Sequence, residues 1–158
     1  MKHDFDKLNE IVHTLRGENG CPWDKEQTHE SIRICMAEEA AEVLDAITLL
    51  KQKGNPQALR EELGDVLFQV LLHSAIAEEE GYFTIDDVVD DISKKMIRRH
   101  PHVFGIYERD AEGNELRSWE EIKAYEQEKK NYRESKIHKK QRKWLTYFFD
   151  KLLSLRNA

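Results

Sequence analysis

Two consecutive stretches of this chain repeat apolar residues at the three- and four-residue spacing of an α-helix, one ending near Gln52 and the next covering residues 56–80. Between them, Gly54 is suited to the end of a helix, and Asn55 and Pro56 are suited to the cap and first turn of another. Only three prolines and seven glycines occur in the whole sequence, which favours long helices. The pattern predicts two long helices that each bury an apolar stripe.

Shorter segments with the same spacing complete the expected fold. The first long helix is expected to begin near Thr28 or Ser31. Because both long helices are apolar over more than one face, we expect a four-helix core that is completed between two chains. No segment alternates like a strand, so we predict an all-α helical bundle. Further helices are predicted over 4–16, over 85–100 with Thr84 as cap, and over 119 to about 133 with Ser118 as cap. Loops are predicted at 20–24 and 102–116. The side chains of the two long helices that are expected to face inward include Ile47, Leu59, Leu63, Val66, Leu67, Val70 and Leu71.

Charge is distributed unevenly along the 158 residues, whose formal net charge is −6. Residues 129–158 hold ten Lys and Arg against two acids (+8), so residues 1–128 hold 15 against 29 (−14). An acidic body binds nucleic acid poorly, because that affinity depends on neutralising phosphates. No stable nucleic-acid partner is therefore expected, and the basic tail is interpreted as a solvated surface.

Three features indicate the compartment. No apolar run approaches the roughly 18 residues that a membrane span needs. The first ten residues, MKHDFDKLNE, lack the apolar stretch of a secretory signal. Cys21 and Cys35 are too few for a disulfide framework. We expect a cytoplasmic protein without a membrane segment.

The two long helices carry carboxylates that lack basic partners. Glu39 and Glu42 are three residues apart and therefore share a helix face, as do Glu62 and Asp65. Neither pair has a Lys or Arg three or four residues away, which argues against surface acids stabilised by neighbouring bases. If the helices pack antiparallel through their apolar stripes, the four carboxylates converge, and such an arrangement needs protons or a cation. Oxygen ligands favour Mg²⁺, with Mn²⁺ as a substitute, over zinc, so the pattern predicts a magnesium site.

Five sequence blocks occur in order between about residues 4 and 128. They are Gly20-Cys-Pro-Trp-Asp-Lys-Glu-Gln27, Glu38-Glu39-x-x-Glu42-Val43-Leu44-Asp45-Ala46, Glu61-Glu62-Leu63-Gly64-Asp65, Arg98-Arg99-His-Pro-His-Val-Phe104 and Trp119-Glu120-x-Ile122-Lys123. Through these blocks the chain resembles the MazG-type nucleoside triphosphate pyrophosphohydrolases, an all-α, magnesium-dependent family.

The resemblance implies an activity and an organisation. The family converts a nucleoside triphosphate and water to the monophosphate and pyrophosphate, and its members form dimers, so a homodimer or higher homo-oligomer is expected. Residues 1–132 would form the pyrophosphohydrolase domain, and residues 133–158 would be a basic, aromatic and helical tail without a match in the family. Longer members carry two copies of this domain, and this chain carries one.

The resemblance also implies roles for individual residues. It makes Glu39, Glu42, Glu62 and Asp65 the magnesium ligands. Lys95 and Arg99 match cations that bind the triphosphate, and Trp119 and Lys123 match a pair that contacts the nucleotide. Arg98 and Trp23 are added as further substrate-binding candidates.

Water attack at the α-phosphorus needs a metal ion to activate the water and a base to take its proton. Glu38 and Glu61, which directly precede the two carboxylate pairs, are the candidates for this catalytic role. Two alternatives stay open at this point. One is a helical regulatory module that binds nucleotide or protein without hydrolysis, and the other is a nucleic-acid accessory protein that acts through residues 129–143.

Overall fold

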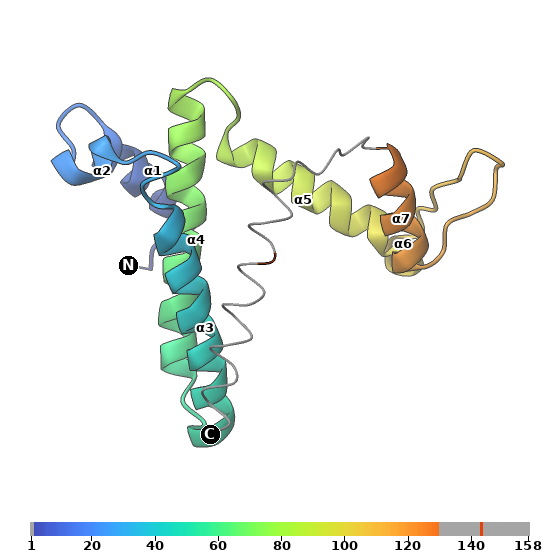
Figure 1. Cartoon of the computed structure of the whole chain (residues 1–158), viewed down its shortest axis with the longest axis horizontal. Coiled ribbons are helices and arrows are strands. Elements are labelled where there is room, and N and C mark those ends of the chain that lie inside the picture. The colour runs from blue at the N-terminus through green and yellow to red at the C-terminus, as the bar shows by residue number, and fades with distance from the viewer. Residues whose placement is uncertain (1, 130–142, 144–158) are drawn as a thin grey trace. The chain divides into compact units, whose positions relative to one another are not determined.

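Helices make up the structure, a computed structural model that describes residues 2–129 and 143 (Figure 1). These residues contain no strand, only an isolated antiparallel bridge between Arg109 and Glu115, so the all-α prediction is confirmed. The chain divides into a first unit, Met1–Asp90, and a second unit, Asp91–Ala158. The helices are α1 (Phe5–Arg16), α2 (Pro22–Glu26), α3 (Arg33–Lys53), α4 (Pro56–Glu79), α5 (Ile85–Arg99), α6 (Pro101–Phe104) and α7 (Trp119–Lys129).

In the first unit, α3 and α4 form an antiparallel hairpin (Figure 1). Gly54 ends α3 with a φ of 64°, a left-handed conformation that glycine adopts without strain, and its N–H donates to the Leu50 carbonyl. The Asn55 side chain then accepts a hydrogen bond from the N–H of Gln57, and Pro56 occupies the first turn of α4. The predicted stop and start signals are confirmed, and the short turn makes the two helices run side by side.

The core of the first unit lies where α1 and the start of α3 meet the second half of α4. Arg16, whose side chain is 4% exposed, closes one end of this core. Its guanidinium donates two 2.7 Å hydrogen bonds to the Glu79 carboxylate and further bonds to the carbonyl oxygens of Asp24 and Gln27. This arginine therefore joins α1, α2 and α4. The buried cluster consists of Val12, Ile32, Leu71, Leu72, Ala75, Ile76 and Ile85.

Part of the hairpin's apolar surface is uncovered. Leu63, Leu67 and Ile47 are 52%, 37% and 48% exposed, so the prediction that they face inward is wrong for the described part of a single chain. The physical reason is that α1 packs on the second half of α4, through the core cluster, and does not reach these positions. The expectation that another copy completes the core remains a prediction.

Two short helices replace segments that were predicted to be loops. Helix α2 occupies most of the expected loop 20–24, and α6 takes the start of the expected loop 102–116. Both have proline in the first turn, where its fixed φ fits a helix and its missing N–H costs no hydrogen bond. Pro101, which directly follows the predicted helix 85–100, therefore begins a short helix of its own.

The predicted helix caps are confirmed at two positions and shifted at a third. The N–H of Glu121 donates to the Ser118 hydroxyl, and the Ser118 N–H donates to the Glu121 carboxylate, which is a capping box. Thr84 caps α5 in the same way. Thr28 and Ser31 instead bond each other's backbone N–H groups within a turn, so α3 begins only after them.

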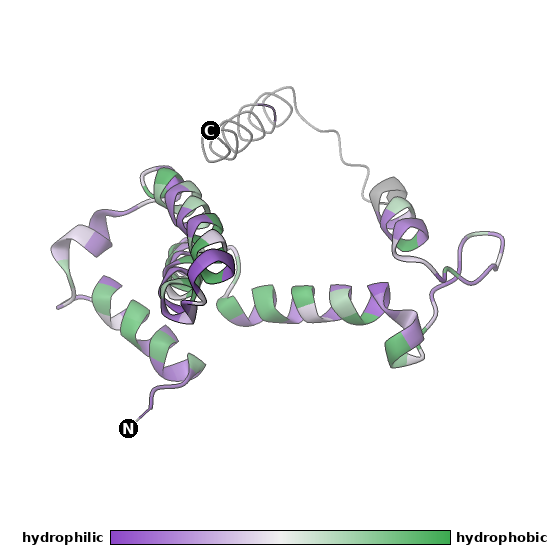
Figure 2. Ribbon diagram, turned by 90° about the horizontal axis from the view of Figure 1, so that it is seen from below, coloured by the Kyte–Doolittle hydropathy of each residue, from purple (hydrophilic) through white to green (hydrophobic). Residues whose placement is uncertain are grey.

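The helices in the described part of the second unit are the last part of α5, α6 and α7. Apolar and polar bands alternate along α5 (Figure 2). Pro101, Leu116 and Ile122 are buried within the second unit. The predicted tail 133–158, apart from residue 143, lies outside the described residues. No helix in the described part of the chain combines the length and apolar content that crossing a membrane requires.

Candidate active site

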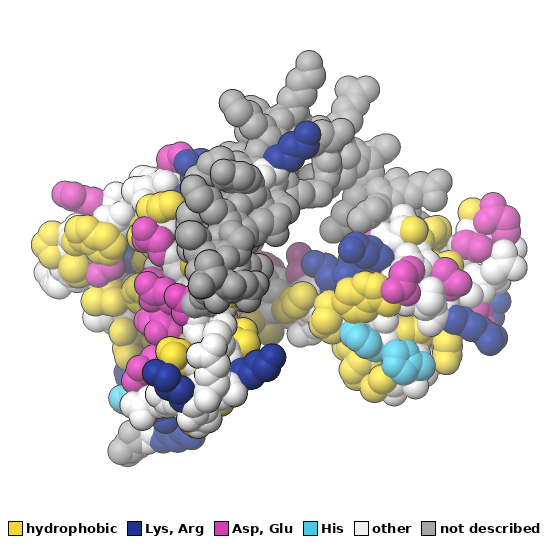
Figure 3. All heavy atoms as spheres, turned by 60° about the horizontal axis from the view of Figure 1, so that its bottom comes forward, with side chains coloured by type: hydrophobic (Ala, Val, Ile, Leu, Met, Phe, Trp, Pro, Cys, Tyr) yellow, Lys and Arg dark blue, Asp and Glu magenta, His cyan; other side chains and the backbone are white. Residues whose placement is uncertain are grey.

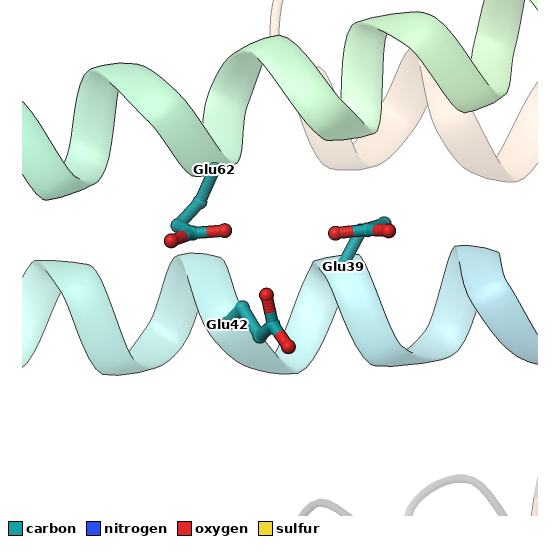
Figure 4. A group of neighbouring side chains, drawn as sticks. All are labelled: Glu39, Glu42 and Glu62. Atoms are coloured by element: carbon teal, nitrogen blue, oxygen red, sulfur yellow. The ribbon is translucent and has the colours of Figure 1, made fainter.

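Three predicted magnesium ligands converge between α3 and α4 (Figure 4). Glu39 and Glu42 extend from neighbouring turns of α3, and Glu62 reaches toward them from α4. Each offers one carboxylate oxygen, and these oxygens lie within 4.8 Å of one another. The three-residue spacing places the first two on one face, and the hairpin turn brings the third opposite them.

Asp65, the fourth predicted ligand, lies one turn beyond Glu62 on α4 and is exposed. It is not part of the group whose oxygens lie within 4.8 Å of one another. Its charge nevertheless raises the pKa values of both Glu39 and Glu62, which places it in their electrostatic neighbourhood.

Crowding raises the pKa of two of these carboxyl groups. Burial, followed by the charges of Asp65, Glu42 and Glu38, raises the pKa of Glu39 above its ordinary value. Burial also raises the pKa of Glu62, with further contributions from a hydrogen bond with Glu42 and from the neighbouring charges. Two carboxyl groups share a hydrogen bond only when one carries a proton. The site therefore resists full ionisation without a positive counter-charge.

The donor set fits a hard divalent cation. The three clustered side chains offer only carboxylate oxygens, the ligands that Mg²⁺ and Mn²⁺ prefer. Among the described residues, no Lys or Arg forms an ion pair with Glu39, Glu42 or Glu62. A cation bound by these three side chains, with Asp65 one turn away, would relieve the repulsion that raises their pKa values. Figure 3 shows acidic side chains gathered on the visible face of the first unit.

The two candidate bases lie outside the clustered carboxylates. Glu38 is exposed on α3, and its charge contributes to the raised pKa of Glu39. Glu61 is exposed on α4, where it accepts a 3.1 Å hydrogen bond from the Gln57 side chain. Trp23, the substrate candidate of the first unit, is 58% exposed on α2.

The other predicted substrate-binding residues belong to the second unit. The guanidinium of Arg99 lies over the Trp119 ring, 4.7 Å from its centroid, in a cation–π contact. His100 packs edge-on against the same ring at 5.3 Å. Lys95 is half-buried on α5, whereas Lys123 is exposed on α7. The structure thus brings together Arg99 and Trp119, two of the residues predicted to bind the substrate.

Glu126 is not among the site residues predicted from the sequence. This residue of α7 bonds both Arg98 and Arg99, and its side chain is only 11% exposed. It follows Trp119 by seven residues, a spacing that shares a helix face, but its partners on α5 are 27 and 28 residues away and no local pattern reveals them.

Residues 27–104 match the model of the MazG nucleotide pyrophosphohydrolase domain, a range that includes all four predicted ligands. The uncharacterized protein YabN of Bacillus subtilis is 51% identical over 137 residues, which cover 87% of this chain and 27% of that protein. The nucleoside triphosphate pyrophosphohydrolase/pyrophosphatase MazG of Thermotoga maritima is 47% identical over 126 residues, 80% of this chain and 46% of that protein. The chain thus spans less than half the length of these curated relatives.

A solved structure supports the same assignment of the fold. The crystal structure of a MazG-related protein from Thermotoga maritima superimposes with a TM-score of 0.54 at 26% identity, and the alignment covers 80% of this chain and 99% of that one. The fold, the ordered sequence blocks and the domain match agree. Through residues 27–104, the chain belongs to the family of MazG nucleotide pyrophosphohydrolase domains.

Proposed function

We propose that this chain is a Mg²⁺-dependent nucleoside triphosphate pyrophosphohydrolase, which converts a nucleoside triphosphate and water to the monophosphate and pyrophosphate. The observation that carries the proposal is the convergence of Glu39, Glu42 and Glu62 from two helices of a MazG domain, without a basic partner among the described residues. Relatives named nucleoside triphosphate pyrophosphohydrolase support the substrate class.

Glu39, Glu42 and Glu62, together with Asp65, would hold the divalent cation. When bound, it would neutralise phosphate oxygens and make a water molecule acidic enough to attack phosphorus near neutral pH. We place the attack at the α-phosphorus, where the water oxygen forms the new P–O bond, the bond to the bridging oxygen breaks, and pyrophosphate leaves.

Glu38 and Glu61 are the proposed acceptors of the proton that the attacking water loses. Both are exposed, so each can exchange that proton with solvent. The charge of Glu38 acts on Glu39, whereas the Glu61 carboxylate is bonded by Gln57. The variants Glu38→Gln and Glu61→Gln distinguish the two candidate bases. Only the variant that lacks the true base should lose the rise of kcat with pH.

The cationic residues of the second unit, with Trp119, are proposed to bind the nucleotide. Lys95, Arg98, Arg99 and Lys123 supply positive charge for phosphate oxygens. Arg99 also stacks on the Trp119 ring. A lysine ammonium lacks the planar guanidinium group and cannot reproduce this stacking. We therefore expect Arg99→Lys to impair activity despite keeping the charge. Trp23 is proposed as an additional contact to the nucleotide.

The test is a product assay with a panel of nucleoside triphosphates and Mg²⁺, in which monophosphate and pyrophosphate are measured together. Glu39→Gln and Glu62→Gln should abolish both products while circular dichroism still shows the helical fold, and Glu18→Gln, an exposed acid, serves as control. Release of inorganic phosphate without pyrophosphate refutes the proposed reaction. Nucleotide binding without product over hours favours the non-hydrolytic regulatory module.

Assembly and location are part of the proposal. We infer a homodimer or higher homo-oligomer, supported by the exposed Ile47, Leu63 and Leu67 on the hairpin. Sedimentation that shows only monomers at micromolar concentration contradicts this. A cytoplasmic location is proposed as well, and cell fractionation tests it. A nucleic-acid role for residues 129–143 is not proposed, because the structure describes only residues 129 and 143 of this range.

A further inference from the structure

One carboxylate joins the two adjacent arginines at the end of α5. The Nε of Arg98 donates to Oε1 of Glu126 at 2.6 Å, and its Nη2 contacts the same oxygen. The Nε and Nη2 of Arg99 donate to the other oxygen, Oε2, at 3.2 and 2.6 Å. Each oxygen of Glu126 therefore serves one guanidinium group.

This pairing leaves donors available. A guanidinium has five N–H groups, and Glu126 engages only the Nε and Nη2 side of each arginine. No acceptor among the described residues bonds the Nη1 groups of the two arginines, which leaves these groups for an anion. The two arginines and Glu126 together keep a net positive charge, which the longer ion pair between Arg98 and Glu108 offsets in part. Glu108, 3.9 Å from the Nε of Arg98, is too distant for a hydrogen bond.

The same carboxylate fixes the face of α7 that meets α5. Trp119, Ile122 and Glu126 recur at three- and four-residue spacing, so they lie on one side of α7. Ile122 is fully buried, and Trp119 contacts Arg99 and His100. Glu126 thus anchors one end of this face while Trp119 packs at the other. Arg99 is held between them, bonded at its edge by Glu126 and stacked on the indole.

Burial makes the arrangement costly to break. The side chains of Glu126 and Arg99 are 11% and 15% exposed, so removal of the carboxylate leaves two neighbouring guanidinium groups partly desolvated and repelling each other. The pKa of Glu126 supports an ionised carboxylate: burial alone would raise it, but the hydrogen bonds from Arg99 and Arg98 outweigh burial and lower it.

We propose that Glu126 is a positioning residue for triphosphate binding, which holds Arg98 and Arg99 so that their unused N–H groups present a preformed anion site beside Trp119. The proposal rests on the proposed function for the identity of the anion. Glu126 itself touches no substrate in this role. By holding the two arginine side chains in place before binding, Glu126 reduces the conformational entropy that these side chains lose when phosphate binds.

The test compares Glu126→Gln and Glu126→Asp with the wild type in steady-state kinetics with Mg²⁺ and a nucleoside triphosphate. Glu126→Gln should raise KM about tenfold, the loss expected for charge-assisted hydrogen bonds, with kcat within about twofold. Glu126→Asp keeps the charge on a shorter side chain and should raise KM only about threefold. Glu112→Gln, the same change of charge at an exposed loop position, is the matched control and should leave both constants unchanged.

The outcomes decide between positioning and simple stabilisation. An unchanged KM in Glu126→Gln, or an equal fall of kcat in both variants without a rise in KM, overturns the proposal. If Glu126→Gln loses its helical circular dichroism, Glu126→Asp decides alone, and an unchanged KM there overturns the proposal as well.

Failure of the proposed function is recognised separately, because the wild type then releases no pyrophosphate. In that case, equilibrium dialysis with the same triphosphate and Mg²⁺ replaces kinetics. The dissociation constant should rise about tenfold in Glu126→Gln, and equal constants for variant and wild type overturn the inference.

Discussion

Replacing Glu39 by glutamine should stabilise the metal-free protein while removing its response to Mg²⁺. The side chain keeps its size and loses one negative charge from a group whose oxygens lie within 4.8 Å of one another. Because the pKa of Glu39 is raised by burial and by neighbouring carboxylates, its ionised form opposes folding at neutral pH. Removal of that charge therefore relieves the folded state more than the unfolded chain.

The expected magnitude follows from distance and solvent. Two unit charges about 5 Å apart repel by slightly less than 1 kcal/mol in a medium as polar as water. Glu39 is only half-buried, so this screened value is the appropriate one. We expect the metal-free variant to be about 1 kcal/mol more stable, which is a rise in Tm of about 2–4 °C for a chain of this length.

The assay is thermal unfolding followed by circular dichroism at pH 7, first with a chelator and then with increasing Mg²⁺. The wild-type Tm should rise with Mg²⁺, because a ligand that binds only the folded state stabilises it, by about 2.7 kcal/mol at a hundred times Kd. The Glu39→Gln variant should show little or no rise. Glu18→Gln, an exposed acid in the same unit, controls for the loss of one charge.

Two results refute this reasoning. A lower Tm for Glu39→Gln in chelator shows that the carboxylate stabilises the metal-free fold. A Mg²⁺-dependent rise equal to that of the wild type shows that Glu39 does not bind the ion.

Three further predictions follow from contacts in the first unit. The Mg²⁺-dependent rise in Tm should become smaller as pH falls, and this should begin above pH 4.5, the ordinary pKa of a glutamate. The reason is that protons compete with Mg²⁺ for Glu39 and Glu62, whose pKa values are raised. A rise in Tm that is unchanged down to pH 4.5 contradicts this. Arg16→Met should cost about 2 kcal/mol in the free energy of unfolding, because it removes the hydrogen bonds that the guanidinium donates to the Asp24 and Gln27 carbonyl oxygens and to the Glu79 carboxylate. The hydrogen bond from Arg16 lowers the pKa of Glu79 in the folded protein. The stability that this pair contributes is therefore present above the pKa of Glu79 in the unfolded chain, and it is lost as pH falls through the lower pKa of the folded protein. The free energies of unfolding of variant and wild type, measured in urea, should therefore converge in acid. Leu71→Ala should cost about 3 kcal/mol because the side chain is fully buried, and a cost below 1 kcal/mol in urea would show that the site collapses around the smaller side chain.

Local signals predicted the parts of the fold that depend on neighbouring residues. Gly54 and Asn55 act through bonds within a few residues, and so do Ser118 and Glu121, so their roles follow from composition and spacing. Thr28 failed as a helix start because its hydroxyl found a partner within its own turn. The same competition makes Ser and Thr signals ambiguous wherever two lie close together.

The carboxylate cluster was predictable for a different reason. Two pairs without bases, on consecutive helices joined by a short turn, leave few arrangements other than convergence, and three of the four side chains converge. The exposure of Leu63 and Leu67 was not predictable, because periodicity shows that a face is apolar and not which element covers it. Glu126 escaped prediction because its partners lie on another helix, and only the folded chain shows which acid meets which base.

The short turn between α3 and α4 makes the carboxylate cluster local in sequence. Glu39 and Glu62 are only 23 positions apart, so the proposed ligands meet as soon as one hairpin closes. Contacts of short sequence separation form rapidly, and like charges brought together at this stage oppose hairpin closure unless a cation is present. Divalent ions should therefore accelerate folding of the wild type and leave the folding rate of a charge-neutralised hairpin unchanged. The proposed metal site is then contained in a single supersecondary unit, which can be duplicated or joined to other segments without rebuilding the site.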